Sequence, residues 1–364
     1  MNNKILILAN NSGGLYGFRK ELIQELIAQG YEVYASTPFD NHIDDLMQLG
    51  IHLIETKINR RGINPINDFK LILDYFKIIK KIRPSLIITY TIKPNLYGGS
   101  VARILKIPYA VNITGLGTAF QNDNLLRKFV VTWYKFACKK VKVLFFENEG
   151  NKNLFLDFNI VDSDKCCVLH GAGVNTEHYY FTKYPSIEDK LHFLFIGRIM
   201  KEKGVDELFW AIDKLYQNNK NIILDVVGSF EDDYESKIKD LEQKGCLHYY
   251  GYQNDVRPFI KQCHCFVLPS YHEGMANTLL ECAAMGRPLI TSNIHGCKET
   301  VIDGKNGYLV EVKNQEDLYE KLSFFINVDF ESKKNMCVES RKHIVENFDK
   351  YKVVNATISN IMSS

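Results

Sequence analysis

Near residue 190 the chain repeats the order of elements with which it begins, and this repeat limits the possible folds more than any other feature. Each copy starts with a short apolar run typical of a buried strand, continues through a glycine-containing loop and enters a segment with helical periodicity. The first copy comprises Lys4–Ala9, Asn10–Gly17 and Phe18–Ala28, and the second comprises Leu191–Ile196, Gly197–Gly204 and Val205–Tyr216. Alternation of strands and helices predicts parallel sheets with right-handed crossovers.

Further predicted strands continue the alternation in both halves. They lie at Tyr31–Ser36, Leu86–Thr89, Tyr109–Asn112 and Val143–Phe146, and at Ile222–Val227, His248–Tyr250, Cys265–Leu268 and Pro288–Thr291. Because 364 residues suffice for two cores, we predict an α/β protein with two doubly wound, Rossmann-like parallel-sheet domains that face a cleft. The predicted domains are residues 1–180 and 191–348, joined by a polar linker at 181–190, and residues 349–364 are expected to hold a final amphipathic helix.

Composition excludes several classes of protein. A formal net charge of +2 gives no general indication of nucleic-acid binding, and no recognition motif for nucleic acid is present. Nine irregularly spaced cysteines favour reduced thiols over a disulfide framework, and Cys263-His264-Cys265 lies in an apolar run where buried small side chains are expected rather than a metal site. The apolar run at Ile5–Ala9 is too short for a signal peptide, and no run of about 18 apolar residues predicts a membrane-spanning helix.

Two carboxylates, Glu273 and Glu281, flank the start of a helix predicted at Ala276–Met285. Eight residues of helix rise by roughly 12 Å, so the two groups cannot share a proton or a metal ion. The helix N-terminus between them presents N–H groups and positive potential, which suit phosphate. This order matches a nucleotide-sugar, with sugar hydroxyls, diphosphate and ribose hydroxyls in turn. The alternatives are a helix cap at Glu273 and an exposed helix carboxylate at Glu281.

A second candidate element is the loop Gly197–Gly204, which follows the first strand of the second half. Arg198 offers a planar fork for phosphate oxygens, and Lys203 offers a compact positive charge. The loop is neither a Walker loop nor a dinucleotide-binding fingerprint, and Gly13-Gly14 in the first half also fails the latter pattern. Taken alone, the two cations could be solvated surface charges. Their occurrence in the same predicted domain as Glu273 and Glu281 favours a diphosphate site.

At these residues the chain resembles the retaining nucleotide-sugar glycosyltransferases of family 4, which have the GT-B fold. The matching motifs are Gly197-Arg198 with Lys203-Gly204, the Glu273-x7-Glu281 unit, Gly286-Arg287-Pro288 followed by Gly296 and Glu299, and Asp303-Gly304-Lys305-Asn306-Gly307. The first half, with Thr91–Asn95 and Asn112–Thr118, is similar to a narrower bacterial group that includes N-acetylgalactosaminyltransferases. That group builds capsule, O-antigen and N-linked glycans on polyprenyl-diphosphate carriers. The family also implies that the final helix packs back on the first domain.

The resemblance implies a role for each matching residue. Arg198 and Lys203 are expected to stabilise the leaving diphosphate, Glu273 to hold donor-sugar hydroxyls and support the positively charged transition state, and Glu281 to bind ribose hydroxyls. The remaining donor-binding residues are expected to be Gly274, Met275, Ala276, Asn277 and Thr278, with Gly13 and Gly14 from the other domain. Many members carry a histidine near the end of the fourth strand of the first domain. Val111–Thr114 contains none, so the resemblance carries no imidazole-dependent step over to this chain.

The acceptor is expected to lie against the first half, near polar residues that follow predicted strands or loops. Candidate acceptor-binding residues are Tyr16, Arg19, Lys93 and Asn95, of which Arg19 and Lys93 could meet a carrier diphosphate; ordinary solvated loop residues are the alternative. No cofactor or bound metal is expected. Asp162-Ser163-Asp164 has the spacing of a metal-binding carboxylate motif, but it also suits a turn or a helix start.

Residues 125–146 hold six Lys or Arg and no acidic residue, interleaved with aromatic side chains. On a helix, Phe129, Trp133, Phe136 and Lys140 fall on one side, and Lys128, Lys135 and Lys139 on another. This pattern suits an interfacial helix on anionic lipid, and equally a core helix with a basic solvent face. We therefore expect a cytoplasmic enzyme, peripheral on the inner face of the membrane.

The resulting expectation is a metal-independent, retaining glycosyltransferase. It would move a hexose or N-acetylhexosamine from a nucleotide-sugar, with UDP suggested by the resemblance, to a lipid-linked or oligosaccharide acceptor. One alternative is a sugar-nucleotide epimerase, which needs an acid/base pair that the first half does not offer in sequence. The other is a binding protein that holds a nucleotide-sugar without chemistry.

Overall fold

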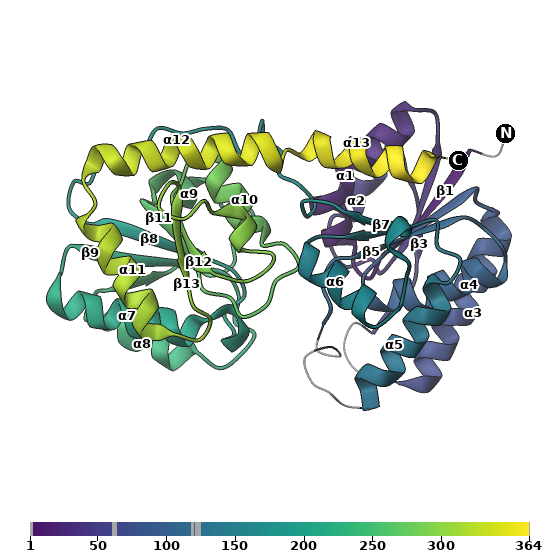
Figure 1. The fold of residues 1–364 in the computed structure, drawn as a ribbon, viewed down its shortest axis with the longest axis horizontal. Coiled ribbons are helices and arrows are strands. Elements are labelled where there is room, and N and C mark those ends of the chain that lie inside the picture. Colours follow the sequence, from purple (N-terminus) through teal and green to yellow (C-terminus); the bar gives the residue numbers. More distant parts are fainter. Residues whose placement is uncertain (1–2, 60–63, 118–119, 121–124, 364) are drawn as a thin grey trace. The chain divides into compact units, whose positions relative to one another are not determined.

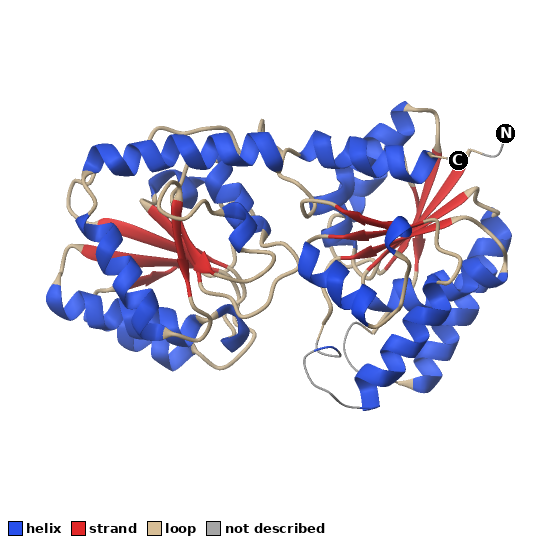
Figure 2. Ribbon diagram, viewed as in Figure 1, coloured by secondary structure: helices blue, strands red, loops and turns tan. Residues whose placement is uncertain are grey.

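The computed structural model describes residues 3–59, 64–117, 120 and 125–363, which form two compact units. Unit 1 contains Met1–Ala172 with Lys350–Ser364, and unit 2 contains Gly173–Asp349. In each unit helices cover both faces of a central sheet (Figure 2). The predicted α/β class with two doubly wound parallel sheets is confirmed.

The sheet of unit 1 has the strand order β3-β2-β1-β4-β5-β6-β7, and all its pairs are parallel. Its strands are β1 (Lys4–Leu8), β2 (Glu32–Thr37), β3 (His52–Glu55), β4 (Leu86–Tyr90), β5 (Tyr109–Ile113), β6 (Val143–Phe146) and β7 (Cys166–Val168). Its helices are α1 (Ser12–Ala28), α2 (Ile43–Gln48), α3 (Pro65–Ile82), the π-helical turn η1 (Pro94–Gly98), α4 (Gly99–Ile104), α5 (Leu125–Cys138), α6 (Glu149–Asp157), the 3₁₀ turn η3 (Ser163–Lys165) and α13 (Lys350–Met362).

The sheet of unit 2 has the order β10-β9-β8-β11-β12-β13 and is also parallel throughout. Its strands are β8 (Leu191–Ile196), β9 (Ile222–Val227), β10 (Leu247–Tyr249), β11 (Cys265–Leu268), β12 (Leu289–Ser292) and β13 (Gly307–Val310). Its helices are α7 (Val205–Asn218), α8 (Glu235–Lys244), α9 (Arg257–Gln262), α10 (Asn277–Ala284), α11 (Gln315–Asn327) and α12 (Phe330–Asn347), with 3₁₀ turns η4 (Lys201–Lys203) and η5 (Lys298–Thr300).

Most strands are buried on both faces, which is why they read as continuous apolar runs. All residues of β4, β5, β6, β9, β11 and β12 are buried. Helices on both faces of a parallel sheet exclude water from each side, so the strands need no polar alternation. Because both faces of the sheet are covered, polar residues for a binding site can gather in the loops at the carboxyl ends of the strands.

The last helix, α13, packs against unit 1, where it lies beside α1 (Figure 1). Val353, Val354, Ile358 and Ile361 enter the core cluster of β1 and α1, and Tyr31 donates its hydroxyl to Met362 Sδ over 3.2 Å. The helix begins at Lys350, one residue later than predicted. Burial of these apolar side chains holds the end of the chain to the domain in which it begins.

Residues 181–190, predicted to be a linker, pack into unit 2 instead. Thr182 and Tyr184 are buried, and the Tyr184 hydroxyl donates to the carbonyl of His264 over 3.1 Å. The fully buried guanidinium of Arg287 donates to the Thr182 carbonyl and hydroxyl and to the Lys183 carbonyl. A buried arginine needs several acceptors, and this segment of irregular backbone supplies them.

Candidate active site

The loops that follow β8 and β11 meet where the sheet of unit 2 reverses its strand order. From β8 the chain proceeds to β9 and β10 on one side, and from β11 to β12 and β13 on the other. Ligands of open parallel sheets bind beyond the carboxyl ends of the strands at this reversal. The loop after β8 holds Arg198 and Lys203, and the loop after β11 holds Glu273. The fold therefore brings two separately predicted elements to one edge.

Lys203 and Glu273 form an ion pair across this edge. Lys203 Nζ lies 2.5 Å from Glu273 Oε1, and the two side chains are only 19% and 12% exposed. Ser270 Oγ donates to the same carboxylate oxygen over 2.8 Å. Two donors on one oxygen fix the orientation of the carboxylate, and partial burial strengthens the attraction between the charges.

Gly204 allows the two loops to approach each other. Its φ of +71° lies in the left-handed region, and a Cβ at this position would lie 2.1 Å from the carbonyl oxygen of Pro269. The loops are also joined by the backbone N–H of Tyr271, which donates to the carbonyl of Glu202 over 2.8 Å. A side chain at Gly204 would force the loops apart and thereby displace Lys203 from Glu273.

A third loop, after β12, supports the backbone of Glu273 and Gly274. Gly296 has a φ of +90°, and a Cβ there would lie 2.6 Å from the Gly274 carbonyl oxygen and 2.8 Å from that of Glu273. Its carbonyl accepts from Ala276 N over 2.9 Å, and its N–H donates to Glu299 Oε2 over 2.8 Å. The other carboxylate oxygen of Glu299 lies 2.8 Å from His295 Nδ1. Glu299 thus anchors the loop on which the start of α10 rests.

The helix α10 begins at Asn277, with Ala276 as its N-cap. Alanine has no side-chain oxygen with which to cap the first turn. The side-chain oxygen of Asn277 is buried and has no hydrogen-bond partner in the described part of the chain. An acceptor buried in this way costs about 1–3 kcal/mol unless a ligand or water supplies a donor. The first turn of α10 therefore combines unpaired backbone N–H groups with a buried side-chain acceptor, both of which suit a polar ligand.

Glu281 lies in the second turn of α10 and is hydrogen-bonded to the hydroxyl of Tyr179. Burial, followed by the charge of Glu281 and this hydrogen bond, raises the pKa of Tyr179 well above its ordinary value. The hydroxyl consequently stays protonated and can act as the donor. Sequence reasoning did not predict Tyr179 as a partner, because it is far from Glu281 in the chain.

Arg198 is placed differently from Lys203 although both belong to the loop after β8. Its side chain is 53% exposed, and its Nη1 lies 3.4 Å from Glu231 Oε2. The neighbouring backbone is held by Lys201 N, which donates to Asp232 Oδ2 over 2.9 Å. The guanidinium is thus exposed to solvent at the same strand edge, with the conformational freedom of an exposed side chain.

Gly13 and Gly14 belong to the first turn of α1, so the prediction of a loop over Asn10–Gly17 is wrong. Asn11 is the N-cap, and its side-chain oxygen accepts from Gly14 N. Asp40 accepts from the N–H and the hydroxyl of Ser12. Burial alone would raise the pKa of Asp40, but hydrogen bonds from Ser12 and Asn41 together lower it. A carboxylate therefore stays charged at the start of α1. The predicted contact of Gly13 and Gly14 with a donor stays a prediction.

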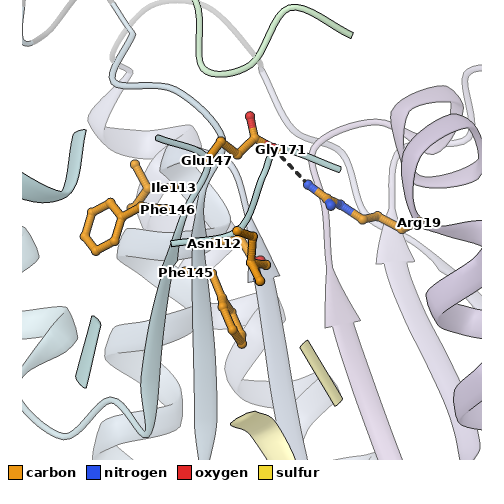
Figure 3. A pocket seen from close by; sticks show the side chains of 8 residues that line it. Arg19, Asn112, Ile113, Phe145, Phe146, Glu147 and Gly171 are labelled. Carbon is orange, nitrogen blue, oxygen red and sulfur yellow. Dashed lines mark hydrogen bonds and ion pairs between the residues drawn. The ribbon is translucent and has the colours of Figure 1, made fainter. Parts of the chain in front are cut away.

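Arg19, predicted to meet a carrier diphosphate, has an internal partner. Its Nη2 lies 3.1 Å from Glu147 Oε1, with side chains 11% and 13% exposed, and its guanidinium lies 4.6 Å from the centre of the Tyr90 ring. The adjoining cavity, of about 10 Å³, has room for about one water molecule (Figure 3). The charge of Arg19 is thus balanced internally, and its contact with a carrier diphosphate stays a prediction.

Two further acceptor candidates also have internal partners. Lys93 Nζ lies 2.7 Å from Asp68 Oδ1, and both side chains are mostly buried. Asn95 is 1% exposed; its amide oxygen accepts from the Thr89 hydroxyl over 2.7 Å, and its nitrogen donates to the Asn112 carbonyl over 2.8 Å. This amide joins β4 to β5, and direct contact between Asn95 and an acceptor stays a prediction.

The remaining acceptor candidate, Tyr16, is half-buried on α1. Its ring stacks on that of His42 at a centroid distance of 5.0 Å. Lys20 Nζ lies 5.2 Å from the Tyr16 ring centre. The role of Tyr16 in acceptor binding stays a prediction.

The candidate metal motifs have structural explanations. Cys263 and Cys265 are fully buried, which raises the pKa of both thiols, and burial lowers the pKa of His264 to about 4. His264 Nδ1 accepts from His192 N over 2.9 Å, so the imidazole is neutral and structural. Asp162 precedes the η3 turn, where Lys165 N donates to its carbonyl over 3.1 Å. Within the described residues no group of three or more His, Cys, Asp or Glu could hold a metal ion.

Two family models match the chain, one on each half. The model described as "Glycosyl transferase 4-like" matches residues 4–148, and that described as "Glycosyl transferases group 1" matches residues 179–347. The second match includes both loops of the candidate site and the whole of α10.

Among curated relatives, an N,N'-diacetylbacillosaminyl-diphospho-undecaprenol alpha-1,3-N-acetylgalactosaminyltransferase from Campylobacter jejuni is 28% identical over 89% of each chain. A UDP-Gal:alpha-D-GlcNAc-diphosphoundecaprenol alpha-1,3-galactosyltransferase from Escherichia coli is 27% identical over 79% of this chain and 77% of its own.

Solved structures share the whole architecture. A glycosyltransferase from Rickettsia africae superposes with a TM-score of 0.80 at 19% identity, covering 100% of both chains. Anabaena HepE in complex with UDP gives a TM-score of 0.80 at 17% identity, covering 99% of this chain and 100% of its own. The predicted GT-B fold is confirmed by these matches. The first half matches the 4-like model and the second half matches the group 1 model. The chain therefore belongs to the family 4 glycosyltransferases.

Proposed function

We propose that the protein is a retaining glycosyltransferase that moves a hexose or N-acetylhexosamine from a UDP-sugar to a sugar on a polyprenyl-diphosphate carrier in bacterial glycan assembly. The observation that carries the proposal is the Lys203–Glu273 ion pair at the strand-order reversal of unit 2, beside the start of α10. The Campylobacter and Escherichia relatives are named for undecaprenyl-diphosphate-linked acceptors, and HepE was solved with UDP. These names support the choice of donor and acceptor class.

The site residues suit a donor that lies along the start of α10. Glu273 would accept hydrogen bonds from sugar hydroxyls, and Glu281 would accept from the ribose hydroxyls. The buried side-chain oxygen of Asn277 can accept a hydrogen bond from a hydroxyl of the nucleotide-sugar. This bond would satisfy an oxygen that otherwise has no partner in the described chain. The first-turn N–H groups of α10 and the charges of Lys203 and Arg198 would face the diphosphate.

Transfer would proceed on one face of the sugar. The bond between C1 and the β-phosphate oxygen breaks, the acceptor hydroxyl oxygen bonds to C1 from the same side, and its proton passes to the departing diphosphate. Lys203 and Arg198 stabilise the negative charge that develops on the diphosphate. Glu273, held by Lys203 and Ser270, stabilises the positive charge that develops at the sugar ring. The acceptor proton needs no separate protein base in this scheme.

A donor and acceptor panel tests this function. UDP release is measured with UDP-glucose, UDP-galactose and their N-acetylamino forms, with and without a polyprenyl-diphosphate-linked N-acetylhexosamine. The product of the best pair is then analysed by NMR for its anomeric configuration. An α-linked product from an α-linked donor supports front-face transfer, whereas a β-linked product contradicts it. Epimerised nucleotide-sugar without transfer would favour the epimerase alternative, and binding without turnover would favour a binding protein.

Metal independence is tested in the same assay. Because Lys203, Arg198 and the start of α10 can neutralise the diphosphate, we expect turnover to persist in excess EDTA. Loss of activity with EDTA and its recovery with a divalent cation would contradict the proposed charge stabilisation.

We also propose that the enzyme acts at the inner face of the cytoplasmic membrane and contacts lipid through one face of α5. Leu125, Phe129 and Phe136 are exposed large apolar side chains, and the exposed lysines Lys128, Lys135 and Lys139 lie on the adjacent side. These six residues form what we call the α5 patch. Apolar side chains next to lysines suit insertion into a bilayer surface that carries anionic lipid.

The structure revises one residue of the predicted lipid-facing side. Trp133 is half-buried; its Nε1 donates to Ser100 Oγ over 3.1 Å, and its ring packs against Tyr97. It therefore belongs to the contact between α5 and the core. None of the described helices is long and apolar enough to span a bilayer. The alternative to a lipid-binding α5 patch is that α5 is a core helix with a basic solvent face.

Flotation with vesicles of phosphatidylcholine and phosphatidylglycerol separates the two interpretations. The double variant Lys135→Glu/Lys139→Glu and the variant Phe129→Ser should both reduce the bound fraction, since one removes charge attraction and the other apolar burial. Charge reversal at the exposed residues Lys305 and Lys342 of unit 2 is the matched control and should leave binding unchanged. Equal binding by all variants would favour the core-helix interpretation.

A further inference from the structure

A second cavity lies in unit 1, beyond the carboxyl ends of β1, β4 and β5. Its volume is about 210 Å³, and it is lined by Asn10, Ile58, Thr91, Ile92, Lys93, Thr114, Gly115 and Gly117. The strand order of unit 1 reverses between β1 and β4, so the cavity lies where an open parallel sheet binds ligands. Pockets for drug-sized molecules begin at roughly 300 Å³, and this smaller volume suits a single ring.

The lining combines apolar walls with uncharged polar groups. Ile58 and Ile92 provide the apolar surface, and Asn10, Thr91 and Thr114 provide amide and hydroxyl groups. A pyranose ring presents the same combination, with C–H faces and hydroxyl edges. This composition suits a ligand that has both apolar and hydroxyl surfaces, as a pyranose has.

The lining offers little net charge for a diphosphate. Lys93 is the one charged residue among those that line the cavity in the described chain, and its Nζ lies 2.7 Å from Asp68 Oδ1. The two side chains are 14% and 9% exposed, so solvent screens the pair weakly. A doubly charged phosphate group would have to compete with Asp68 for this ammonium. An uncharged ligand would leave the ion pair intact.

Thr91, which lines the cavity, has a strained backbone and a buried hydroxyl. Its φ is +72°, which is uncommon for a β-branched residue and occurs mainly at functional sites. Its Oγ1 is buried and has no hydrogen-bond partner within the described residues. Its carbonyl accepts from Asn95 N over 2.9 Å, next to the π-helical turn Pro94–Gly98. The residue thus combines a strained backbone beside the cavity with a buried hydroxyl that lacks a partner in the described chain.

We infer that this cavity binds an uncharged sugar ring of the acceptor and leaves the carrier diphosphate outside. The inference rests on the proposed function, because it assigns the acceptor's sugar to unit 1. Thr91 Oγ1 hydrogen-bonds a sugar hydroxyl, Ile58 and Ile92 contact the ring's C–H face, and the Lys93–Asp68 pair forms a neutral rim. Thr91 is accordingly a residue that determines acceptor affinity.

Saturation-transfer NMR on the full chain tests the inference with methyl α-glycosides of glucose, galactose and their N-acetylamino forms, without donor. At least one glycoside should bind the parent protein and Thr91→Ser, and binding should be lost in Thr91→Val, which keeps the shape but removes the hydroxyl. Sodium pyrophosphate should not displace the bound glycoside. The variant Ser359→Ala, which removes an exposed hydroxyl on α13, is the matched control and should bind as the parent does.

Kinetics with a lipid-linked acceptor provide the second measurement. Thr91→Val should raise the acceptor KM by about 10-fold, because the sugar hydroxyl loses its partner in a partly buried site, and should leave the donor KM unchanged. Displacement by pyrophosphate, equal binding by Thr91→Val, or absence of binding by every glycoside would overturn the inference. If glycosides bind as expected but no UDP-sugar is turned over, the proposed function fails while the sugar site stands.

Discussion

Loss of the Lys203–Glu273 ion pair should impair both stability and turnover, and the structure allows the first effect to be estimated. Removing one partner of a fully buried pair costs about 3–5 kcal/mol, because the remaining charge is left without compensation. Here the side chains are 19% and 12% exposed, and Ser270 still donates to Glu273, so for Lys203→Met we expect a loss of roughly 1–3 kcal/mol. For a domain of 150–250 residues this corresponds to a decrease in Tm of roughly 2–12 °C.

A double-mutant cycle isolates the interaction. Lys203→Met, Glu273→Gln and the double variant are compared by urea unfolding in a Trp133→Phe background, in which Trp210 of unit 2 is the remaining tryptophan. The double variant should be less destabilised than the sum of the single variants, with a coupling of roughly 1–2 kcal/mol. Lys201→Met is the matched control, since Lys201 is an exposed neighbour in η4 and its removal should change stability little.

Turnover separates the catalytic role from the structural one. Each single variant should lower kcat on the order of 10²-fold, and the double variant should recover no activity although it recovers stability. Coupling below about 0.3 kcal/mol together with near-normal kcat would refute the reasoning, because residues in direct contact should not behave as independent sites. Normal coupling with normal kcat would show that the pair is only structural.

Three further variants test contacts elsewhere in unit 2. Gly296→Ala should lower kcat by roughly 10-fold or more, because the new Cβ would lie 2.6 Å from the Gly274 carbonyl oxygen. Steady-state kinetics measure the effect. An unchanged kcat would contradict the idea that the loop after β12 supports Glu273 and Gly274. Burial lowers the pKa of His264 from 6.5 to about 4, so the stability that its neutral imidazole contributes is fully present above about pH 6.5 and is lost as pH falls towards 4. When unfolding in urea is measured at several pH values, the free energy of unfolding should depend less on pH in His264→Asn than in the parent. Arg287→Met should destabilise unit 2 by about 3 kcal/mol in thermal unfolding, because several buried acceptors lose their donor. A Tm within about 2 °C of the parent, which corresponds to roughly 1 kcal/mol, would argue against this.

The strands that are buried on both faces were the most predictable elements. β6, β8, β9 and β11 have the predicted bounds, because a parallel strand covered on two sides is a short apolar run between polar or glycine-containing segments. The start of α1 was not predicted. The glycines of Gly13-Gly14 predict a loop, but the Asn11 side chain caps the helix ahead of them. A capping asparagine outweighs the low helix propensity of two glycines in the first turn.

Partners distant in sequence account for most of what could not be predicted at the sites. The motif spacing identified Glu273 and Lys203 separately, but their contact spans 70 residues and depends on the strand order of unit 2. The contact between Arg19 and Glu147 spans 128 residues. A sequence pattern shows which polar residues follow strands, whereas the fold decides which of them neutralise one another.

An ion pair at a strand end can therefore be either structural or functional, and its surroundings distinguish the two. Arg19 and Glu147 border a cavity with room for about one water. Lys203 and Glu273 lie at a reversal of strand order, beside a helix start where the buried oxygen of Asn277 has no partner in the described chain. Only the second pair adjoins a polar group that a ligand would satisfy. This difference, more than the presence of charge, is the reason to assign the chemistry to unit 2.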